Sequence, residues 1–360
     1  MTESSTTDHS HSTPPSGIAY GLLSALLFGL STPFAKLLVG EIEPLMLAAL
    51  LYLGSGCGLS LLWLVKRMRS SERLNPIKPN ELPWLIGAIA FGGIISPVLL
   101  MFGLSMTMGS TGSLLLNLEG VLTAVLAWVV FKEHCDRRIV SGMVAIALGG
   151  IVLSVAGQNG FELSWGCVLI VLACLGWAID NNLTRQISHA EPLQIALTKG
   201  VCAGAVNLTL ALSLSNSTPP PVTIASAMLV GFLGYGISLV LFVLALRYVG
   251  TARAGAYFST APFIGALAAI VLLREPISWN LAVAALLMGI GVYLHLSENH
   301  EHYHVHDELF HEHEHIHDEH HQHEHTDEDP PGEPHTHAHN HEPLAHAHAH
   351  FPDLHHRHEH

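Results

Sequence analysis

Long apolar runs constrain this chain more than any other feature. Ten stretches of mostly apolar residues follow one another between residues 17 and 297. A helix needs about 20 such residues to cross a ~30 Å hydrocarbon layer. We therefore predict an all-α membrane protein with ten transmembrane helices. They are expected at 17–39, 44–65, 83–106, 110–131, 138–157, 164–184, 191–213, 224–247, 251–273 and 278–297.

The C-terminal end has a different composition. Of the 28 histidines, 24 lie after residue 294. Residues 298–360 hold one arginine and 16 acids, whereas residues 1–297 hold 14 basic and 13 acidic residues. A segment with few aliphatic residues and many charges cannot bury a core. We expect a disordered tail over 298–360 and a disordered N-terminus over 1–16.

The basic residues predict the orientation of the chain. Cytoplasmic loops of membrane proteins carry an excess of lysine and arginine. With ten spans, the even-numbered loops lie on the same side as both termini, and they hold Lys66, Arg67, Arg69, Arg73, Lys78, Lys132, Arg137, Arg138, Arg185, Arg247 and Arg253. The odd-numbered loops hold little beyond Arg274. We expect a multi-pass protein of the bacterial inner (plasma) membrane with both termini, and hence the tail, in the cytoplasm.

The two halves of the membrane part resemble each other. The segment EPLMLAALLYLGSGCG at 43–58 matches EPLQIALTKGVCAGAV at 191–206, and SPVLLMFGL at 96–104 matches SLVLFVLAL at 238–246. This divides the membrane part into two repeats, 17–157 and 158–297, of five spans each. Because five is odd, the second copy must enter the membrane from the opposite side. Inverted repeats of this kind are typical of alternating-access transporters.

At this point the chain resembles a known family. The fourth span of each copy ends in a basic residue and a glutamate, Lys132-Glu133 and Arg274-Glu275. Together with the two five-span copies, this is similar to EamA-type members of the drug/metabolite transporter superfamily. The segment LLNLEGVLTAVLAWVVFKE at 115–133 resembles that family's fourth span, although Gly120 stands where many members carry proline; Pro262 keeps it in the second copy. The resemblance implies transport of a small solute. Some members with histidine-rich ends are associated with nickel and cobalt resistance, and this chain resembles them in that respect.

Glu119 is the first candidate for function. It lies midway along the fourth span, two residues after Asn117. Ionisable groups inside a membrane are costly and mark function by default. One reading is a carboxylate that binds a cation or exchanges it for protons. The other is a buried carboxylate hydrogen-bonded between helices.

A second polar group spans two neighbouring helices. Asp180, Asn181 and Asn182 follow one another near the end of the sixth span, and Lys199 lies in the seventh. Asp180 and Lys199 are equidistant from the turn near 189–190, so they are expected at one depth and can form an ion pair. Pairing lowers the cost of burying either charge. The pair could lock the hairpin or act as a gate or coupling site.

The predicted spans lack the usual donors for transition metals. None of them before residue 295 contains histidine, and the five cysteines form no CxxC motif. The loop KEHCDRR at 132–138 groups three donor types, but a short polar loop explains it more simply. A divalent ion crossing the membrane would therefore meet oxygen donors and water around Glu119 and Asp180 to Asn182. Lys36 is expected to extend its amine to the interface.

The tail, by contrast, has the pattern of a metal-binding segment. Histidines two residues apart lie on the same side of an extended strand, and imidazole suits Ni²⁺, Co²⁺ and Zn²⁺. We expect these ions to bind the tail, with affinity falling below about pH 6 as the imidazoles protonate. The candidate ligands are His300, His302, His304, His306, His311, His313, His315, His317, His320, His321, His323, His325, His335, His337, His339, His341, His346, His348 and His350.

Three functions fit this sequence. The favoured one is a secondary transporter that exports divalent metal ions by proton antiport, the tail collecting metal in the cytoplasm. The alternative is an exporter of a small organic metabolite or drug with a metal-buffering or metal-sensing tail. The third, a membrane metal store, fits the repeat poorly. No nucleotide-binding motif GxxxxGK[ST] is present, so we expect metal efflux to be driven by proton antiport. We expect neither an enzyme nor a required cofactor. The expected partners are lipid and the solute, with no nucleic acid; a homodimer is left open.

Overall fold

A computed structural model describes the backbone of residues 15–69, 78–131, 137–154, 164–187, 191–214, 218–296, 300–306, 309–315, 335–341 and 344–350. The chain divides into two compact units, residues 1–297 and residues 298–360. The helices of the first unit are α1 (Pro15–Val39), α2 (Pro44–Arg69), η1 (Pro79–Glu81), α3 (Leu82–Ala88), η2 (Ile89–Ile95), α4 (Ser96–Met106), α5 (Gly109–Leu115), α6 (Asn117–Phe131), α7 (Arg137–Ser154), α8 (Trp165–Arg185), α9 (Pro192–Leu214), α10 (Pro221–Gly231), η3 (Phe232–Ile237), α11 (Ser238–Phe258), α12 (Ala261–Leu272) and α13 (Trp279–Leu296).

These helices make the chain a multi-pass membrane protein. Within the described ranges, nine helical segments are long and apolar enough to cross a bilayer. The tenth expected span corresponds to α13, whose apolar part, Trp279–Leu294, is shorter. One expected connection differs, because α11 continues through residues 248–250. Residues 246–253 contain one glycine and no proline, so no strong helix breaker separates the two expected spans.

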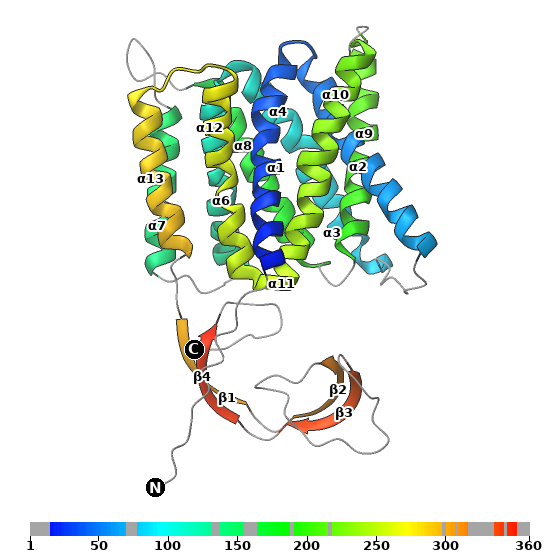
Figure 1. The fold of residues 1–360 in the computed structure, drawn as a ribbon, viewed down its shortest axis with the longest axis vertical. Coiled ribbons are helices and arrows are strands. Elements are labelled where there is room, and N and C mark those ends of the chain that lie inside the picture. Colours follow the sequence, from blue (N-terminus) through cyan, green and yellow to red (C-terminus); the bar gives the residue numbers. More distant parts are fainter. Residues whose placement is uncertain are drawn as a thin grey trace. The chain divides into compact units, whose positions relative to one another are not determined.

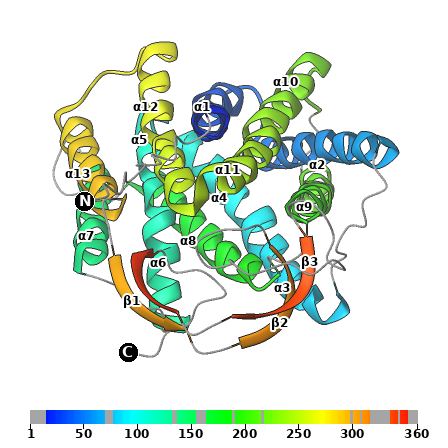
Figure 2. The same cartoon turned by 60° about the horizontal axis from the view of Figure 1, so that its bottom comes forward.

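Helix contacts follow the repeat seen in the sequence. The second spans of the two copies, α2 and α9, pack against each other, and so do the fifth spans, α7 and α13. Figure 1 and Figure 2 show these two pairs at opposite edges of the bundle. Between them, α4 packs on α8 while α1 packs on α11. The contact between α4 and α8 thus has its counterpart in the contact between α1 and α11.

Both third spans contain a π-helix at the same register. The π-helix η2 ends immediately before Ser96 and η3 ends immediately before Ser238, and these two serines begin the matching segments of the repeat. Each π-helix packs against the first two spans of the other copy, η2 on α8 and α9 and η3 on α1 and α2. The π-helices therefore lie where the two copies meet.

Both fourth spans are broken, where the sequence predicts continuous helices. In the first copy the break lies at Leu116, between α5 and α6; in the second it lies at Ser259 and Thr260, between α11 and α12. The first break occurs without the family's proline. The side-chain amide of Asn117 donates instead to the carbonyl of Leu114, 3.0 Å away, and such local bonds compete with the helix.

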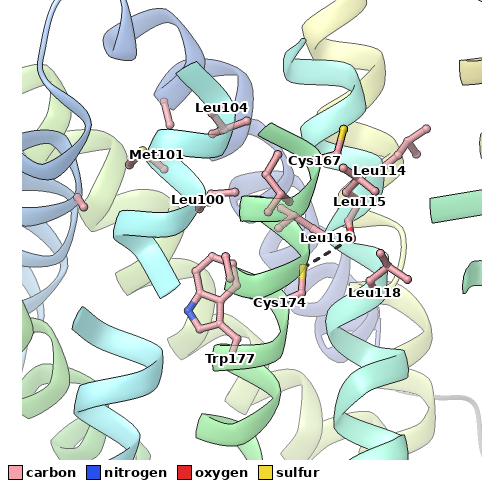
Figure 3. Packing of buried hydrophobic residues seen from close by; sticks show 14 of the residues in the cluster. Leu100, Met101, Leu104, Leu114, Leu115, Leu116, Leu118, Cys167, Cys174 and Trp177 are labelled. Carbon is pink, nitrogen blue, oxygen red and sulfur yellow. Dashed lines mark hydrogen bonds between the residues drawn. The ribbon is translucent and has the colours of Figure 1, made fainter. Parts of the chain in front are cut away.

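Apolar side chains from α4, α5 and α8 form the centre of the core. Figure 3 shows Leu100 and Leu104 of α4, Leu115 of α5 and Cys174 of α8 packed together. All four are essentially inaccessible. The thiol of Cys174 donates to the carbonyl of Leu115 over 3.6 Å. This cysteine therefore behaves as a small buried hydrophobe.

Glycines let the second spans approach closely. A Cβ on Gly200 of α9 would lie 2.7 Å from the backbone of Gly56 in α2. A Cβ on Gly54 of α2 would clash with the backbone of Met228 in α10. Glycines four residues apart, Gly54 and Gly58 in α2 and Gly200 and Gly204 in α9, are typical of such close packing.

The C-terminal unit contains strands, which corrects the expectation of a disordered tail. Strand β1 (His300–His306) pairs antiparallel with β4 (Leu344–His350), and β2 (Leu309–His315) pairs with β3 (His335–His341). Histidine at every second position has the period of a strand, so the alternation that suggests metal binding also suits strand pairing. The register sets histidine opposite histidine at three positions in each pair.

We expect Gly200→Ala to destabilise the folded protein by about 1–3 kcal/mol, because the added methyl overpacks the α2–α9 contact. The measurement is the melting temperature of the detergent-solubilised protein. Gly289→Ala is the matched control, since a Cβ there meets nothing within 4 Å. Equal melting temperatures for the two variants would show that the α2–α9 contact does not require glycine at position 200.

Candidate functional site

Glu119 lies in the first turn of α6, directly after the break in the fourth span. The position suits a carboxylate, because the partial positive charge of a helix N-terminus stabilises anions. The side-chain amide of Asn181 in α8 donates to Oε1 over 3.0 Å. The hydroxyl of Thr123 donates to the backbone carbonyl of Glu119 over 2.8 Å and is itself 3.3 Å from the Asn181 amide. These contacts fix the carboxylate between α6 and α8.

The other carboxylate oxygen of Glu119 has no such partner. It accepts no hydrogen bond from the residues that the structure describes. Glu119 is half-buried and Asn181 is exposed. In a lipid environment an accessible charged group at mid-span is stable only where water reaches it. Glu119 therefore combines a fixed position with a free acceptor.

Asp180 and Lys199 form the ion pair that the hairpin geometry predicts. The amine of Lys199 lies 2.6 Å from Oδ1 and 2.5 Å from Oδ2 of Asp180. The hydroxyl of Thr184 donates to Oδ1 over 2.9 Å. The Asp180 side chain is 7% exposed, and a Cβ on Gly92 of η2 would clash with its carboxylate. The pair joins α8 to α9 and packs against the π-helix of the first copy.

The two other asparagines predicted for the site have structural contacts. Asn117 is buried; its amide donates to the Leu114 carbonyl and lies 3.8 Å from the sulfur of Met288. Asn182 is also buried and donates to the backbone carbonyls of Ala178 and Thr123, at 2.9 and 3.3 Å. Of the three consecutive polar residues in α8, only Asn181 therefore contacts Glu119.

Proline in the third span leaves a carbonyl that two aromatic residues satisfy. The N–H of Ser96 donates to the carbonyl five residues earlier, the π-helical pattern. The next such bond, to Gly92, would come from Pro97, which has no N–H. Instead, the hydroxyl of Tyr52 and the indole N–H of Trp177 donate to the Gly92 carbonyl, at 2.6 and 2.9 Å. A backbone acceptor within the membrane is thereby paired internally, as hydrocarbon requires.

A row of aromatic rings leads away from Tyr52. Its ring centroid lies 5.9 Å from that of Tyr235 in η3. Tyr235 lies 5.9 Å from Phe28 of α1, and Phe28 lies 5.2 Å from Phe258 of α11. All four residues are half-buried. Sequence reasoning missed them, because aromatic residues are common in apolar spans and only the fold brings these together from four elements.

Glu275, part of the second Arg-Glu pair, anchors a loop of the first copy. Its carboxylate accepts hydrogen bonds from the backbone N–H groups of Gly109 and Ser110, at 2.6 and 2.8 Å. This caps the start of α5. Nearby in the first copy, Lys36 donates to the Leu104 carbonyl at the end of α4, over 2.5 Å; the amine is thus held by protein rather than extended to an interface. These contacts are structural rather than part of the Glu119 site.

The described residues contain no group of three or more histidine, cysteine, aspartate or glutamate side chains arranged to hold a metal ion. The loop residues His134, Cys135 and Asp136, and the tail residues His317, His320, His321, His323 and His325, lie outside the described range. Fourteen of the proposed tail ligands lie in the strands β1 to β4.

Comparison with known proteins identifies the family. The model of the EamA-like transporter family matches residues 15–155 and again residues 164–297. The chain belongs to the EamA-like transporter family. It is therefore a membrane transporter, and the two matches correspond to the two copies of the repeat.

Individual relatives agree with this assignment. An uncharacterized transporter of Methanothermobacter thermautotrophicus is 27% identical over 289 residues, 76% of this chain and 84% of the relative. A protein of Salmonella typhimurium named "Probable amino-acid metabolite efflux pump" is 26% identical over 201 residues, 51% of this chain and 66% of the relative. A crystal structure with 19% identity has the same fold, with a TM-score of 0.59 over 78% of this chain and 98% of that one.

Neutralising one member of the ion pair should destabilise the protein strongly. We expect Asp180→Asn and Lys199→Met each to cost about 3–5 kcal/mol, because each leaves a buried, unpaired charge. The double variant Asp180→Leu/Lys199→Met should melt closer to the wild type than either single variant, and exchanging the two charges should also recover part of the loss. A double variant that is folded but inactive in transport would instead assign the pair a role in gating or coupling.

Proposed function

We propose that this protein is a secondary transporter that exports a small organic solute from the cell by alternating access in exchange for protons. The observation that carries the proposal is the carboxylate of Glu119. It is held at the break of a membrane-spanning helix, and one of its oxygens is free of protein partners among the described residues. A carboxylate in this position can bind either a proton or a solute, and binding of one lowers its affinity for the other.

The paired architecture supports alternating access. We propose that the two copies are inverted in the membrane, as two repeats of five spans imply, and that both termini are cytoplasmic. Each π-helix contacts the first two spans of the opposite copy. A movement of one copy against the other would therefore change the packing around both π-helices. The solute would be bound near Glu119, between the copies.

An organic cargo is favoured by the chemistry around Glu119. Among the described residues its hydrogen-bond partners are the amide of Asn181 and, at its backbone carbonyl, the hydroxyl of Thr123, and the nearby carboxylate of Asp180 is already paired with Lys199. The Salmonella relative is named for efflux of an amino-acid metabolite, which is consistent with an organic solute. We propose the plasma membrane as the location.

Divalent metal export remains the second candidate, and one observation favours it. The tail strands set histidine opposite histidine at six positions, and directly opposed residues have Cβ atoms about 4.5–5.5 Å apart. We propose that the tail binds Ni²⁺, Co²⁺ or Zn²⁺. In the favoured function this would buffer or sense metal; in the second candidate it would deliver the ion to the membrane part.

We expect Glu119→Gln to lower solute export about tenfold or more, because a hydrogen bond to a charged group contributes about 1.5–3 kcal/mol and the amide cannot exchange a proton. The measurement compares cells that express the wild type with cells that express the variant, both lacking their own metal exporters. Extracellular metabolites are quantified by mass spectrometry, and the cellular contents of nickel, cobalt and zinc are determined in parallel. Glu41→Gln is the matched control, because Glu41 is an exposed carboxylate in the turn that follows α1.

The same cells would separate the two candidates. If the favoured function is right, a variant truncated after Ser297 should still raise the concentration of an organic solute in the medium. A fall in cellular metal that requires the tail would support the second candidate. Export by Glu119→Gln at the wild-type rate would show that this carboxylate is not the transport site.

A further inference from the structure

We propose that the exported solute carries a single protonated amine, which binds Glu119 while its organic part lies against the rings of Tyr52 and Tyr235. This rests on the proposed function and adds the substrate class. It excludes metal ions and favours amines over amino acids.

The first argument is the net charge of the region. Asp180, which precedes Asn181 in α8, and Lys199 of α9 neutralise each other within one ion pair. Among the described residues of this region, an ionised Glu119 is therefore the uncompensated negative charge. A monovalent cation would neutralise it. A divalent ion would leave a positive charge and a neutral solute a negative one, both costly at this depth.

The charge count also argues against an intact amino acid. An amino acid brings a carboxylate as well as an amine, and that carboxylate would need a cation. Lys199 is engaged by both oxygens of Asp180, and Lys36 is held at the Leu104 carbonyl. A zwitterion would thus place a second carboxylate near Glu119 with neither lysine free to meet it.

The hydrogen-bonding groups point to a donor-rich ligand. Glu119 offers one oxygen that accepts no hydrogen bond within the described part of the chain. Asn181 uses its amide nitrogen to donate to Glu119 and Thr123, which leaves the amide oxygen as a second acceptor. Two acceptors on neighbouring helices match the N–H donors of an ammonium group. An alcohol, with one donor, could satisfy only one of them.

The aromatic rings supply a surface for the rest of the molecule. Tyr52 reaches this region, because its hydroxyl donates to the carbonyl of Gly92, and Gly92 packs against Asp180, the residue that precedes Asn181. The rings of Tyr52 and Tyr235 are 5.9 Å apart and inclined at 38°, and both are half-buried. Aromatic faces attract cations within about 6 Å of the ring centroid, and they also pack against apolar groups. A carboxylate beside such rings is suited to an organic ammonium ion.

A metal ion fits this site poorly. Zinc takes about four protein or water ligands, and calcium six to eight oxygens. Here Glu119 is the one carboxylate of the site that is not already paired, and no group of three acidic or metal-binding side chains occurs among the described residues. Any metal bound by the tail would then serve a different purpose from the transported solute.

The test uses the purified full-length protein in detergent and in proteoliposomes. The probes share one ring: phenethylamine, its neutral counterpart 2-phenylethanol, and phenylalanine, which adds a carboxylate. Ethylamine and tryptamine extend the size range, and Ni²⁺ alone tests the metal. We expect the amines to raise the melting temperature, as ligands of the folded state do, and to be taken up by counterflow. 2-Phenylethanol and phenylalanine should do neither, and Ni²⁺ should not be transported.

Three variants complete the test. Glu119→Gln should abolish stabilisation by phenethylamine, whereas Glu41→Gln should keep it. Tyr235→Leu should weaken phenethylamine binding about tenfold and Tyr235→Phe by less than about threefold, since a cation–π contact contributes about 0.5–2 kcal/mol and phenylalanine keeps the ring. Failure of every amine to bind, or equal binding by Glu119→Gln, would overturn the inference. If cells nevertheless exported a neutral or acidic solute, the proposed function would stand and only the substrate class would be wrong.

Discussion

The ion pair between Asp180 and Lys199 determines the electrostatics of the membrane part. Two charges in hydrocarbon are tolerated because each oxygen of Asp180 lies within 2.6 Å of the Lys199 amine. This contact joins the first two spans of the second copy, and it packs on Gly92 in the π-helix of the first copy. Because the pair is neutral, Glu119 remains as the uncompensated charge beside it. The proposed function of the site depends on that difference between two carboxylates.

The repeat provides the scaffold, but the polar residues break its symmetry. At the offsets that align the two copies, Glu119 corresponds to Ala261, Asp180 to Thr32 and Lys199 to Leu51. The backbone features, by contrast, occur twice: a π-helix in each third span and a break in each fourth. The repeat therefore supplies a two-fold framework, whereas the charges on which the proposed function depends have no counterpart in the other copy.

Much of this architecture could be predicted from the sequence, because it depends on the lengths of apolar segments and on the spacing of residues along the chain. The spans follow from apolar length, and the Asp180–Lys199 pair follows from equal distances to one turn. The aromatic row could not be predicted, since Tyr52 and Tyr235 meet only where a π-helix packs across the repeat. The different roles of Asn181 and Asn182 could not be predicted either, because the two residues are of the same type and adjacent in the chain. Consecutive side chains point in different directions on a helix, so Asn181 contacts Glu119 whereas Asn182 donates to backbone carbonyls. The strands of the tail were not predicted, because the composition of the tail is unsuited to a buried core. Two strands can pair without such a core, and histidine at every second position already has the period of a strand.

The two π-helices are a feature of the repeat rather than of either copy. Such helices are rare and frequently lie at functional sites. Here the π-helix ends at equivalent residues, immediately before Ser96 and Ser238, in copies whose sequences have otherwise diverged. Because each π-helix packs against the first two spans of the other copy, the same irregular backbone occurs on both sides of the contact between the copies.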